Sequence, residues 1–323
     1  MYDVKKTIEE ITSSKEINNV SFTGCGGSLA CFYAPYYYLT REAAKLSTNY
    51  GNANEFSHDW PKNVGPNSIV VCASRRGNTA QTVEAAKKAK ELGATVIALQ
   101  LETDTPLEKV ADYTIQFKDT GVDGALYEES KSAYALAIAY ETLYAVEKNE
   151  ETYEAMKSAM KKMNEIVPDA RVKVVPDAVK FSIDYAKNDI IYTMGSGTAW
   201  AAAQQQTICI FMEMQWINSS VIHSDEFFNG PFEITEPDTA YLFLKSTGRT
   251  REVDERALRF LSKYNNHTTV IDGWDYGMKD MGEVSEYYDH SFYSEILDVY
   301  NNLLADRRQH PLSWRKYMWK FNY

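Results

Sequence analysis

Three things that the sequence lacks narrow the class of protein. The chain of 323 residues has no apolar run of membrane-spanning length, and its N-terminal residues form no apolar signal-peptide segment. Its four cysteines follow no zinc-binding spacing, and three of them stand in or beside apolar runs, as buried thiols do. We therefore expect a cytoplasmic protein of a reducing compartment, without a structural metal.

An excess of basic residues is also missing. The chain has 34 Lys and Arg against 45 Asp and Glu, which gives a net charge of −11. This balance argues against a nucleic-acid partner, because phosphate backbones bind basic faces. A small anionic ligand needs only a locally positive pocket, so the composition is compatible with such a ligand.

One segment of the chain has the pattern of an anion site. An apolar strand at 68–72 leads through a loop at 74–79 into a helical pattern at 82–92. The first N–H groups of such a helix lack partners, and its dipole is positive there. The loop adds the hydroxyls of Ser74 and Thr79 and the charges of Arg75 and Arg76. A phosphate monoester suits this chemistry, although an ordinary N-capped turn has the same pattern.

The order of expected elements occurs twice along the chain. The first half gives a helix at 4–14, strands at 19–24, 68–72, 94–99 and 113–117, and helices after the glycine turn at 24–28, at 82–92 and at 129–148. After a charged helical connector at 149–177, the second half gives strands at 189–194, 240–244 and 268–272, with a glycine turn at 195–198, a helix at 199–217 and a Ser/Thr-rich loop at 245–250. We predict an α/β fold of two tandem domains, 1–150 and 151–323, each a mostly parallel sheet flanked by helices in a flavodoxin-like sandwich.

Several short motifs together resemble a known family. They are Cys25-Gly-Gly-Ser28, Ser74-Arg-Arg-Gly-Asn-Thr79, Glu129-Ser130-Lys131, Met212-Glu-Met-Gln-Trp216 and Glu226-Phe-Phe-Asn-Gly-Pro231. Over nearly the whole chain they resemble the sugar isomerase (SIS) family, in the double-domain form of the isomerase half of glucosamine-6-phosphate synthase. The last two motifs and the C-terminal run from His310 are most similar to fructosamine and fructoselysine 6-phosphate deglycases.

The resemblance implies a reaction and a base. It implies cleavage of a 6-phosphorylated Amadori product into glucose 6-phosphate and an amine, by proton transfer between C1 and C2 and hydrolysis of an imine. No cofactor is implied, and the active sites are expected to be shared in a homodimer. The proton-transfer glutamate of the family falls on Glu213, whose apolar neighbours at 208–212 predict a partly desolvated carboxylate of raised pKa.

The remaining site residues are also assigned through the resemblance. For the phosphate we expect Ser28, Ser74, Arg76 and Thr79 as side-chain ligands, with backbone groups of Gly27 and Arg75. We expect Glu129 to bind a sugar hydroxyl, and Lys316 falls where the synthase's C-terminal tail brings a lysine.

At Asn229 the sequence departs from the family. Relatives carry a histidine at this position, sixteen residues after the base, and an amide cannot transfer a proton at neutral pH. Three explanations stay open: an engineered substitution, another residue in the role, for which His223 is a candidate, or a binder that has lost catalysis. Two other functions stay open as well, a glucosamine-6-phosphate deaminase or isomerase and a phosphosugar-binding regulator without catalysis.

Overall fold

The computed structural model describes residues 3–321 and forms two compact units, Met1–Asn164 (unit 1) and Glu165–Tyr323 (unit 2). The division falls inside one long helix, α7 (Glu150–Lys173). The boundary expected at 150/151 lies at the start of this helix.

Unit 1 is built on five parallel strands in the order β2-β1-β3-β4-β5, the order of flavodoxin-like folds. The strands are β1 (Asn19–Gly24), β2 (Ser47–Asn52), β3 (Ser68–Ala73), β4 (Thr95–Gln100) and β5 (Tyr113–Gln116). All residues of β1 and β3 are buried, as expected for central strands of a parallel sheet. The edge strand β2 was not predicted, because its sequence Ser-Thr-Asn-Tyr-Gly-Asn has no apolar run.

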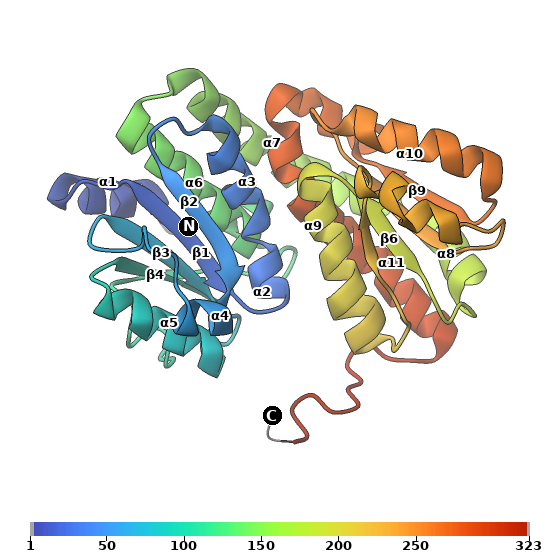
Figure 1. The fold of residues 1–323 in the computed structure, drawn as a ribbon, viewed down its shortest axis with the longest axis horizontal. Helices are drawn as coiled ribbons and strands as arrows, with labels where there is room; N and C mark the ends of the chain where they lie inside the picture. The colour runs from blue at the N-terminus through green and yellow to red at the C-terminus, as the bar shows by residue number, and fades with distance from the viewer. Residues whose placement is uncertain (1–2, 322–323) are drawn as a thin grey trace. The chain divides into compact units, whose positions relative to one another are not determined.

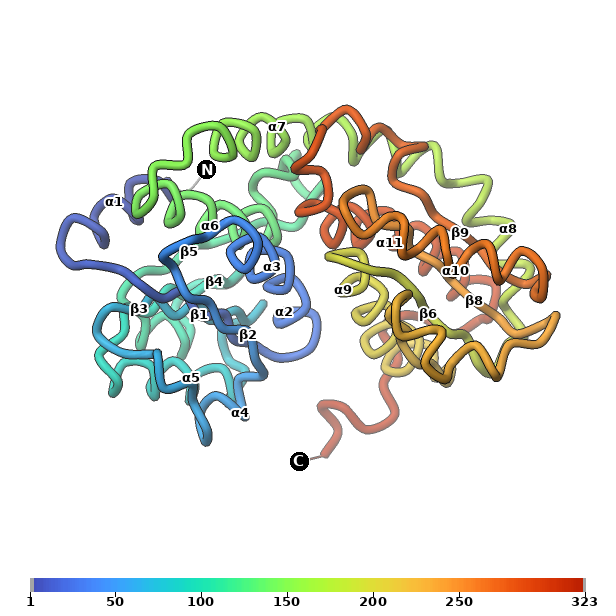
Figure 2. Tube along the Cα trace, turned by 45° about the horizontal axis from the view of Figure 1, so that its top comes forward, coloured from blue at the N-terminus to red at the C-terminus, as the bar shows by residue number. Residues whose placement is uncertain are grey.

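Helices cover both faces of this sheet (Figures 1 and 2). They are α1 (Val4–Ser14), α2 (Gly27–Ala30), α3 (Tyr33–Glu42), α4 (Ala53–His58), α5 (Ala80–Glu91), the short 3-10 helix η1 (Tyr127–Glu129) and α6 (Lys131–Glu147). Helices α1 and α3 pack against α6, whereas α4 packs against α5. The helix expected to run from the glycine turn is in fact divided into α2 and α3.

Unit 2 repeats this plan with four parallel strands in the order β7-β6-β8-β9. The strands are β6 (Tyr192–Gly195), β7 (Val221–His223), β8 (Tyr241–Lys245) and β9 (Thr268–Asp272). The other elements are α8 (Val175–Tyr185), α9 (Gly197–Gln205), the π-helix η2 (Gln206–Met214), the 3-10 helices η3 (Glu226–Asn229), η4 (Pro231–Ile234), η5 (Gly273–Tyr276) and η6 (Met278–Tyr288), and the helices α10 (Arg251–Tyr264) and α11 (Asp289–Arg308). The single helix expected at 199–217 is therefore α9 continued by a π-helix.

A glycine at the end of the first strand of each unit shows how closely the loops approach. A Cβ on Gly24 would lie 3.2 Å from the carbonyl oxygen of Ala73, the residue opposite it on β3. A Cβ on Gly195 would lie 2.8 Å from the carbonyl oxygen of Leu244 on β8. In each unit the glycine turn and the next loop thus leave neighbouring strands at the same carboxyl edge of the sheet, where α/β proteins bind ligands.

Candidate functional site

The loop between β3 and α5, residues 74–79 (the first loop), is tightly folded. The hydroxyls of Ser74 and Thr79 lie 2.9 Å apart, and the Gly77 N–H donates to the Ser74 carbonyl at 3.0 Å. Gly77 has a φ of +60°, and a Cβ on it would lie 2.2 Å from Oγ1 of Thr105. Only glycine fits this turn, which fixes the direction of the N–H groups that follow it.

The first loop presents hydrogen-bond donors that have no partner in the protein. Within residues 3–321, the backbone N–H groups of Arg75, Arg76 and Asn78 donate no hydrogen bond. The hydrogen bonds of helix α5 begin only at Val83, whose N–H donates to the carbonyl of Thr79 at 3.0 Å. A set of free N–H groups at the start of a helix is an anion-binding arrangement.

Both arginine side chains of the first loop turn to carboxylates. Arg75 makes two hydrogen bonds to Asp119, at 2.6 and 2.5 Å, which raise the pKa of the guanidinium. Arg76 lies 3.7 Å from Glu102, and both of these side chains are more than half exposed. Exposed ion pairs contribute little to the stability of a protein, so Arg76 can leave Glu102 and bind a phosphate instead. The backbone N–H of Arg75, which the sequence analysis assigned to the phosphate, is still open.

Beside the glycine turn after β1 lies a cation that the sequence analysis did not include among the candidate residues. Lys131, the first residue of α6, donates through Nζ to the Gly27 carbonyl at 3.1 Å. No carboxylate of the described residues forms an ion pair with Lys131. Ser28 lies in α2, beside this contact, and Cys25 Sγ accepts from the Thr82 hydroxyl at 3.9 Å, which joins the turn to α5. The motif Glu129-Ser130-Lys131 was the available signal.

Glu129 itself has local partners. Its carboxylate accepts from Lys118 Nζ at 2.6 Å and from the Leu126 N–H at 3.2 Å. The hydrogen bond from Lys118 and then that from Leu126 lower the pKa of Glu129. For its predicted contact, the carboxylate would accept a further hydrogen bond from a sugar hydroxyl beside these two donors.

The corresponding loop of unit 2, residues 245–250 (the second loop), is filled by the protein itself. Its backbone N–H groups donate to three carboxylates, Ser246 to Asp254 at 2.7 Å, Thr247 to Asp289 at 3.0 Å and Arg249 to Glu286 at 2.9 Å. All three carboxylates are fully buried. The two loops therefore have the same place in the fold. They differ in their backbone N–H groups, because those of Ser246, Thr247 and Arg249 already donate to carboxylates of the protein.

Glu213 lies in the π-helix η2 and is half-buried. Its carboxylate forms an ion pair with Arg315, with Oε1 2.7 Å from Nη2. Burial raises the pKa of Glu213, and the Arg315 charge and hydrogen bond act in the opposite direction. The apolar neighbours Ile208 and Met212 are themselves exposed, so they do not supply the burial that the sequence analysis assigned to them.

The C-terminal segment after α11, residues 309–321 (the tail), brings this arginine to Glu213. The ring of Trp216, two residues after the end of η2, lies 4.5 Å from the His310 ring, which lies 4.8 Å from that of Trp314. Lys316, the residue predicted to reach the site, is exposed and lies over the ring of its neighbour Tyr317. The tail cation on Glu213 is thus Arg315, one residue earlier.

His223 and Asn229 occupy different surroundings in unit 2. His223 ends β7 opposite Gly195, at the carboxyl edge of the sheet, and its Nδ1 accepts from the Asp225 N–H at 3.2 Å. Burial, more than any other influence, lowers the pKa of His223, which favours the neutral ring. Asn229 is exposed at the end of η3, and its side chain makes no hydrogen bond within residues 3–321.

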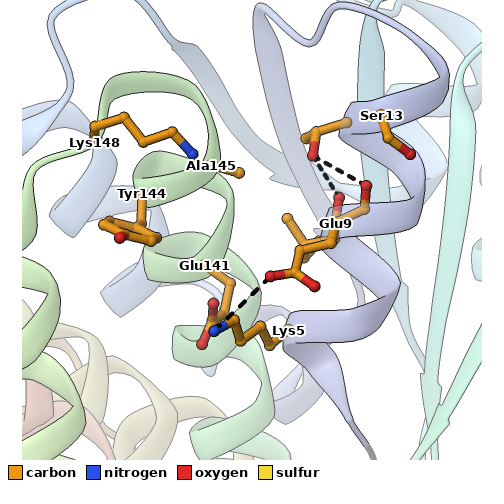
Figure 3. A pocket seen from close by; sticks show the side chains of 9 residues that line it. Lys5, Glu9, Ser13, Glu141, Tyr144, Ala145 and Lys148 are labelled. Carbon is orange, nitrogen blue, oxygen red and sulfur yellow. Dashed lines mark hydrogen bonds and ion pairs between the residues drawn. The ribbon is translucent and has the colours of Figure 1, made fainter.

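A separate hollow in unit 1 contains none of the candidate residues. It has a volume of about 280 Å³ and lies between α1 and α6, where Lys5 reaches toward Glu9 and Glu141 lies beside them (Figure 3). Burial raises the pKa of Glu141, which accepts a hydrogen bond from Tyr153 at 3.2 Å. Because these groups are paired with one another, we assign the hollow no role in the site.

Between residues 3 and 321, no three His, Cys, Asp or Glu side chains are grouped as a metal site would require. In the same part of the chain, no helix combines the length and the apolar character needed to cross a bilayer.

Comparison with known proteins places the chain in a family. The SIS domain model matches residues 15–120, which include the first loop and the glycine turn. Fructosamine deglycase FrlB of Bacillus subtilis (strain 168) is 36% identical over 96% of this chain and 94% of its own. Fructoselysine 6-phosphate deglycase of Escherichia coli (strain K12) is 23% identical over 83% and 77%.

A solved structure agrees with these matches. A protein of Salmonella typhimurium LT2, assigned as a phosphosugar isomerase, is 42% identical and superposes with a TM-score of 0.96 over 99% of this chain and 96% of its own. Identity at this level over nearly the full length of the chains establishes common membership: the chain belongs to the SIS domain family.

Proposed function

We propose that the chain is a phosphosugar deglycase that cleaves a 6-phosphorylated fructosamine into glucose 6-phosphate and an amine or amino acid. The observation that carries the proposal is Glu213, a half-buried carboxylate of raised pKa on a π-helix. Such a carboxylate is suited to proton transfer near neutral pH, and π-helical turns occur frequently at functional sites. The relatives at 36% and 23% identity support the choice of substrate class.

The proposed reaction proceeds through proton transfers on the open-chain sugar. Glu213 removes a proton from C1 while the C2 oxygen gains one, which gives an enaminol, and a proton is then added to C2, which gives a protonated imine at C1. Water adds to C1, the amine leaves, and the aldose 6-phosphate remains. No cofactor takes part in these steps.

In this proposal the first loop anchors the phosphate. Its open N–H groups, the Ser74 and Thr79 hydroxyls, Ser28 and the Gly27 backbone form the cradle, with Arg76 and Lys131 as cations. Anchoring a remote phosphate supplies binding energy that positions the reacting carbons. The closed second loop supports the choice of the first.

We also propose that unit 2 is a second SIS domain and that the protein acts as a cytoplasmic homodimer with shared active sites. The repeated strand order and the matching glycines Gly24 and Gly195 support the first part. The exposed apolar side chains of Ile208 and Met212 on η2, and of Trp216 two residues after its end, support a partner surface near Glu213.

The test is to incubate the protein with 6-phosphorylated fructose–amino acid conjugates and to assay glucose 6-phosphate. We expect turnover that Glu213→Gln abolishes. Glucosamine 6-phosphate is the comparison substrate, and release of ammonia from it would favour a deaminase instead.

Asn229 favours one further function, a phosphosugar-binding regulator without catalysis, because its amide transfers no proton. Calorimetric binding of the conjugates without any glucose 6-phosphate formed, also in Asn229→His, would support the regulator over the deglycase.

A further inference from the structure

We infer that Arg315 is a positioning residue for Glu213, whose carboxylate it fixes in place and holds in the ionised, base-competent form. The catalytic meaning of this inference rests on the proposed function. The contact itself does not, because it concerns two side chains of unit 2 and is measurable without a substrate.

The contacts of the guanidinium divide between the tail and the base. Nη1 donates to the carbonyls of Leu312 and Trp314, at 2.8 and 2.7 Å, while Nη2 lies 2.7 Å from Oε1 of Glu213. The Arg315 side chain is only 9% exposed, and that of Glu213 is 22% exposed. The guanidinium is thus held by the tail backbone on one side and presents its charge to the carboxylate on the other.

The tail is fastened to the end of the element that carries Glu213. Gln215, two residues after the base, donates through Nε2 to the His310 carbonyl at 2.7 Å. Trp216 adopts a φ of +55°, which is uncommon for a bulky residue, and its ring meets those of His310 and Trp314. Arg315 therefore follows directly on a segment whose position is defined relative to η2.

Two opposing influences decide the state of the base. Burial disfavours the carboxylate anion of Glu213, and Arg315 is the charged group that opposes burial. Without Arg315 only the burial effect would remain, so the pKa of Glu213 would rise. A general base must be ionised before it can accept a proton, so the fraction of active enzyme at neutral pH would then fall.

The experiment measures the pKa of Glu213 directly. The protein is labelled with ¹³C at the glutamate carboxyl carbons, the Glu213 resonance is assigned by its loss in Glu213→Gln, and its shift is followed against pH. We expect Arg315→Ala to raise the pKa of Glu213 by about 1–3 units, the usual effect of an adjacent opposite charge. Arg315→Lys keeps the charge and should recover most of this shift.

Lys320→Ala provides the matched control, because Lys320 is an exposed cation of the same tail and is not paired with Glu213. We expect no shift in this variant. An unchanged Glu213 pKa in Arg315→Ala, or equal shifts in Arg315→Ala and Lys320→Ala, overturns the inference.

Kinetics then separate positioning from a merely structural role. If turnover of the conjugate is found, the acidic limb of the kcat/KM profile should move to higher pH in Arg315→Ala and stay in place in Lys320→Ala. An equal loss at every pH would contradict the inference. Absence of turnover in all variants would count against the proposed function alone, since the ¹³C titration needs no substrate.

Discussion

The Ser74 and Thr79 hydroxyls hydrogen-bond to each other at 2.9 Å, and the Ser246 and Thr250 hydroxyls do the same in unit 2 at 3.0 Å. The difference between the loops lies in the backbone donors, which only the second loop fills with carboxylates. Matching threonine variants can therefore show which loop binds phosphate.

Thr79→Ala should weaken binding of a 6-phosphorylated sugar by about tenfold to a hundredfold, because a hydrogen bond to a charged group contributes roughly 1.5–3 kcal/mol. Thr250→Ala, its counterpart, should change affinity much less. Isothermal titration with glucose 6-phosphate measures both. A greater loss in Thr250→Ala would reverse our assignment of the phosphate site.

Replacing Asn229 with histidine should change the rate of turnover but not the affinity for the substrate. The side chain is exposed and makes no hydrogen bond among the described residues, so a histidine should fit there without disturbing the fold. A general acid–base group typically contributes about 10²- to 10⁴-fold in rate, and Asn229→His should raise kcat within that range.

The accompanying control is the double variant with Glu213→Gln, in which the gain should disappear. A protein that already turns over rapidly, or one that Asn229→His leaves slow, would show that Asn229 does not stand in place of the missing acid. His223, at the carboxyl edge of the unit 2 sheet, would then be tested.

Local motifs single out candidate residues, whereas contacts supplied by a distant segment leave no local signal. Glu213 and the first loop were proposed because each lies in a short motif within its own element, and both assignments stay predictions. The pairing of Glu213 with Arg315 joins η2 to the tail, and no local pattern encodes a contact of that kind. The tail was recognised as basic and aromatic, but the residue expected from it was Lys316.

At the scale of the elements, the second loop contacts a buried carboxyl, that of Asp254, whose titration should make the stability of the protein depend on pH. Burial raises the pKa of this carboxyl to about 6 from its ordinary value of 3.8, more than its hydrogen bonds lower it. The folded state therefore keeps a proton that the unfolded state has lost between about pH 4 and 6. The stability from this proton is fully present below pH 4 and is lost as pH rises through 6.

Asp254→Asn should remove that part of the pH dependence. In the parent protein, the titration of Asp254 should lower the free energy of unfolding by up to about 3 kcal/mol between pH 4 and 7, since one pKa unit corresponds to about 1.4 kcal/mol. In Asp254→Asn this part of the decrease should be absent. Urea titrations at several pH values provide the measurement. The exposed Asp238 serves for comparison, and an Asp238→Asn curve matching that of Asp254→Asn would refute the assignment.

Most elements were predicted from hydrophobic patterns, and the exceptions have physical reasons. The predictions of α1, β1 and β9 are confirmed residue for residue, because a strong amphipathic or apolar run defines each. Strands β2 and β7 were missed, because β2 has a polar edge sequence and β7 has only three residues. The π-helix η2 replaces a regular helix at these residues, and no periodicity of the sequence distinguishes the two.

For the molecule as a whole, the test of shared active sites uses two variants that are each inactive alone. One is the double variant Glu213→Gln with Asn229→His, and the other is Asn229→Ala. If Glu213 of one subunit works with the turn of its partner, mixing them creates one complete site in each hybrid dimer. Equal mixing should then give about a quarter of the activity of Asn229→His, because half of the dimers are hybrids.

Subunit exchange has to be verified, for instance by mass spectrometry of differently labelled subunits. Confirmed exchange without recovered activity would mean that Glu213 and the Asn229 turn of the same chain work together.

In the second loop, carboxylates of the same chain take the place that a bound anion would occupy. Asp254, Glu286 and Asp289 occupy the donors at any concentration of sugar phosphate, so the second loop gains no stability from phosphate binding. Unit 1, whose donors are open, should gain it as the ligand concentration exceeds its dissociation constant. A saturating phosphosugar should thus bind with one equivalent per chain and protect the amides of α5, but not those of α10, from hydrogen exchange.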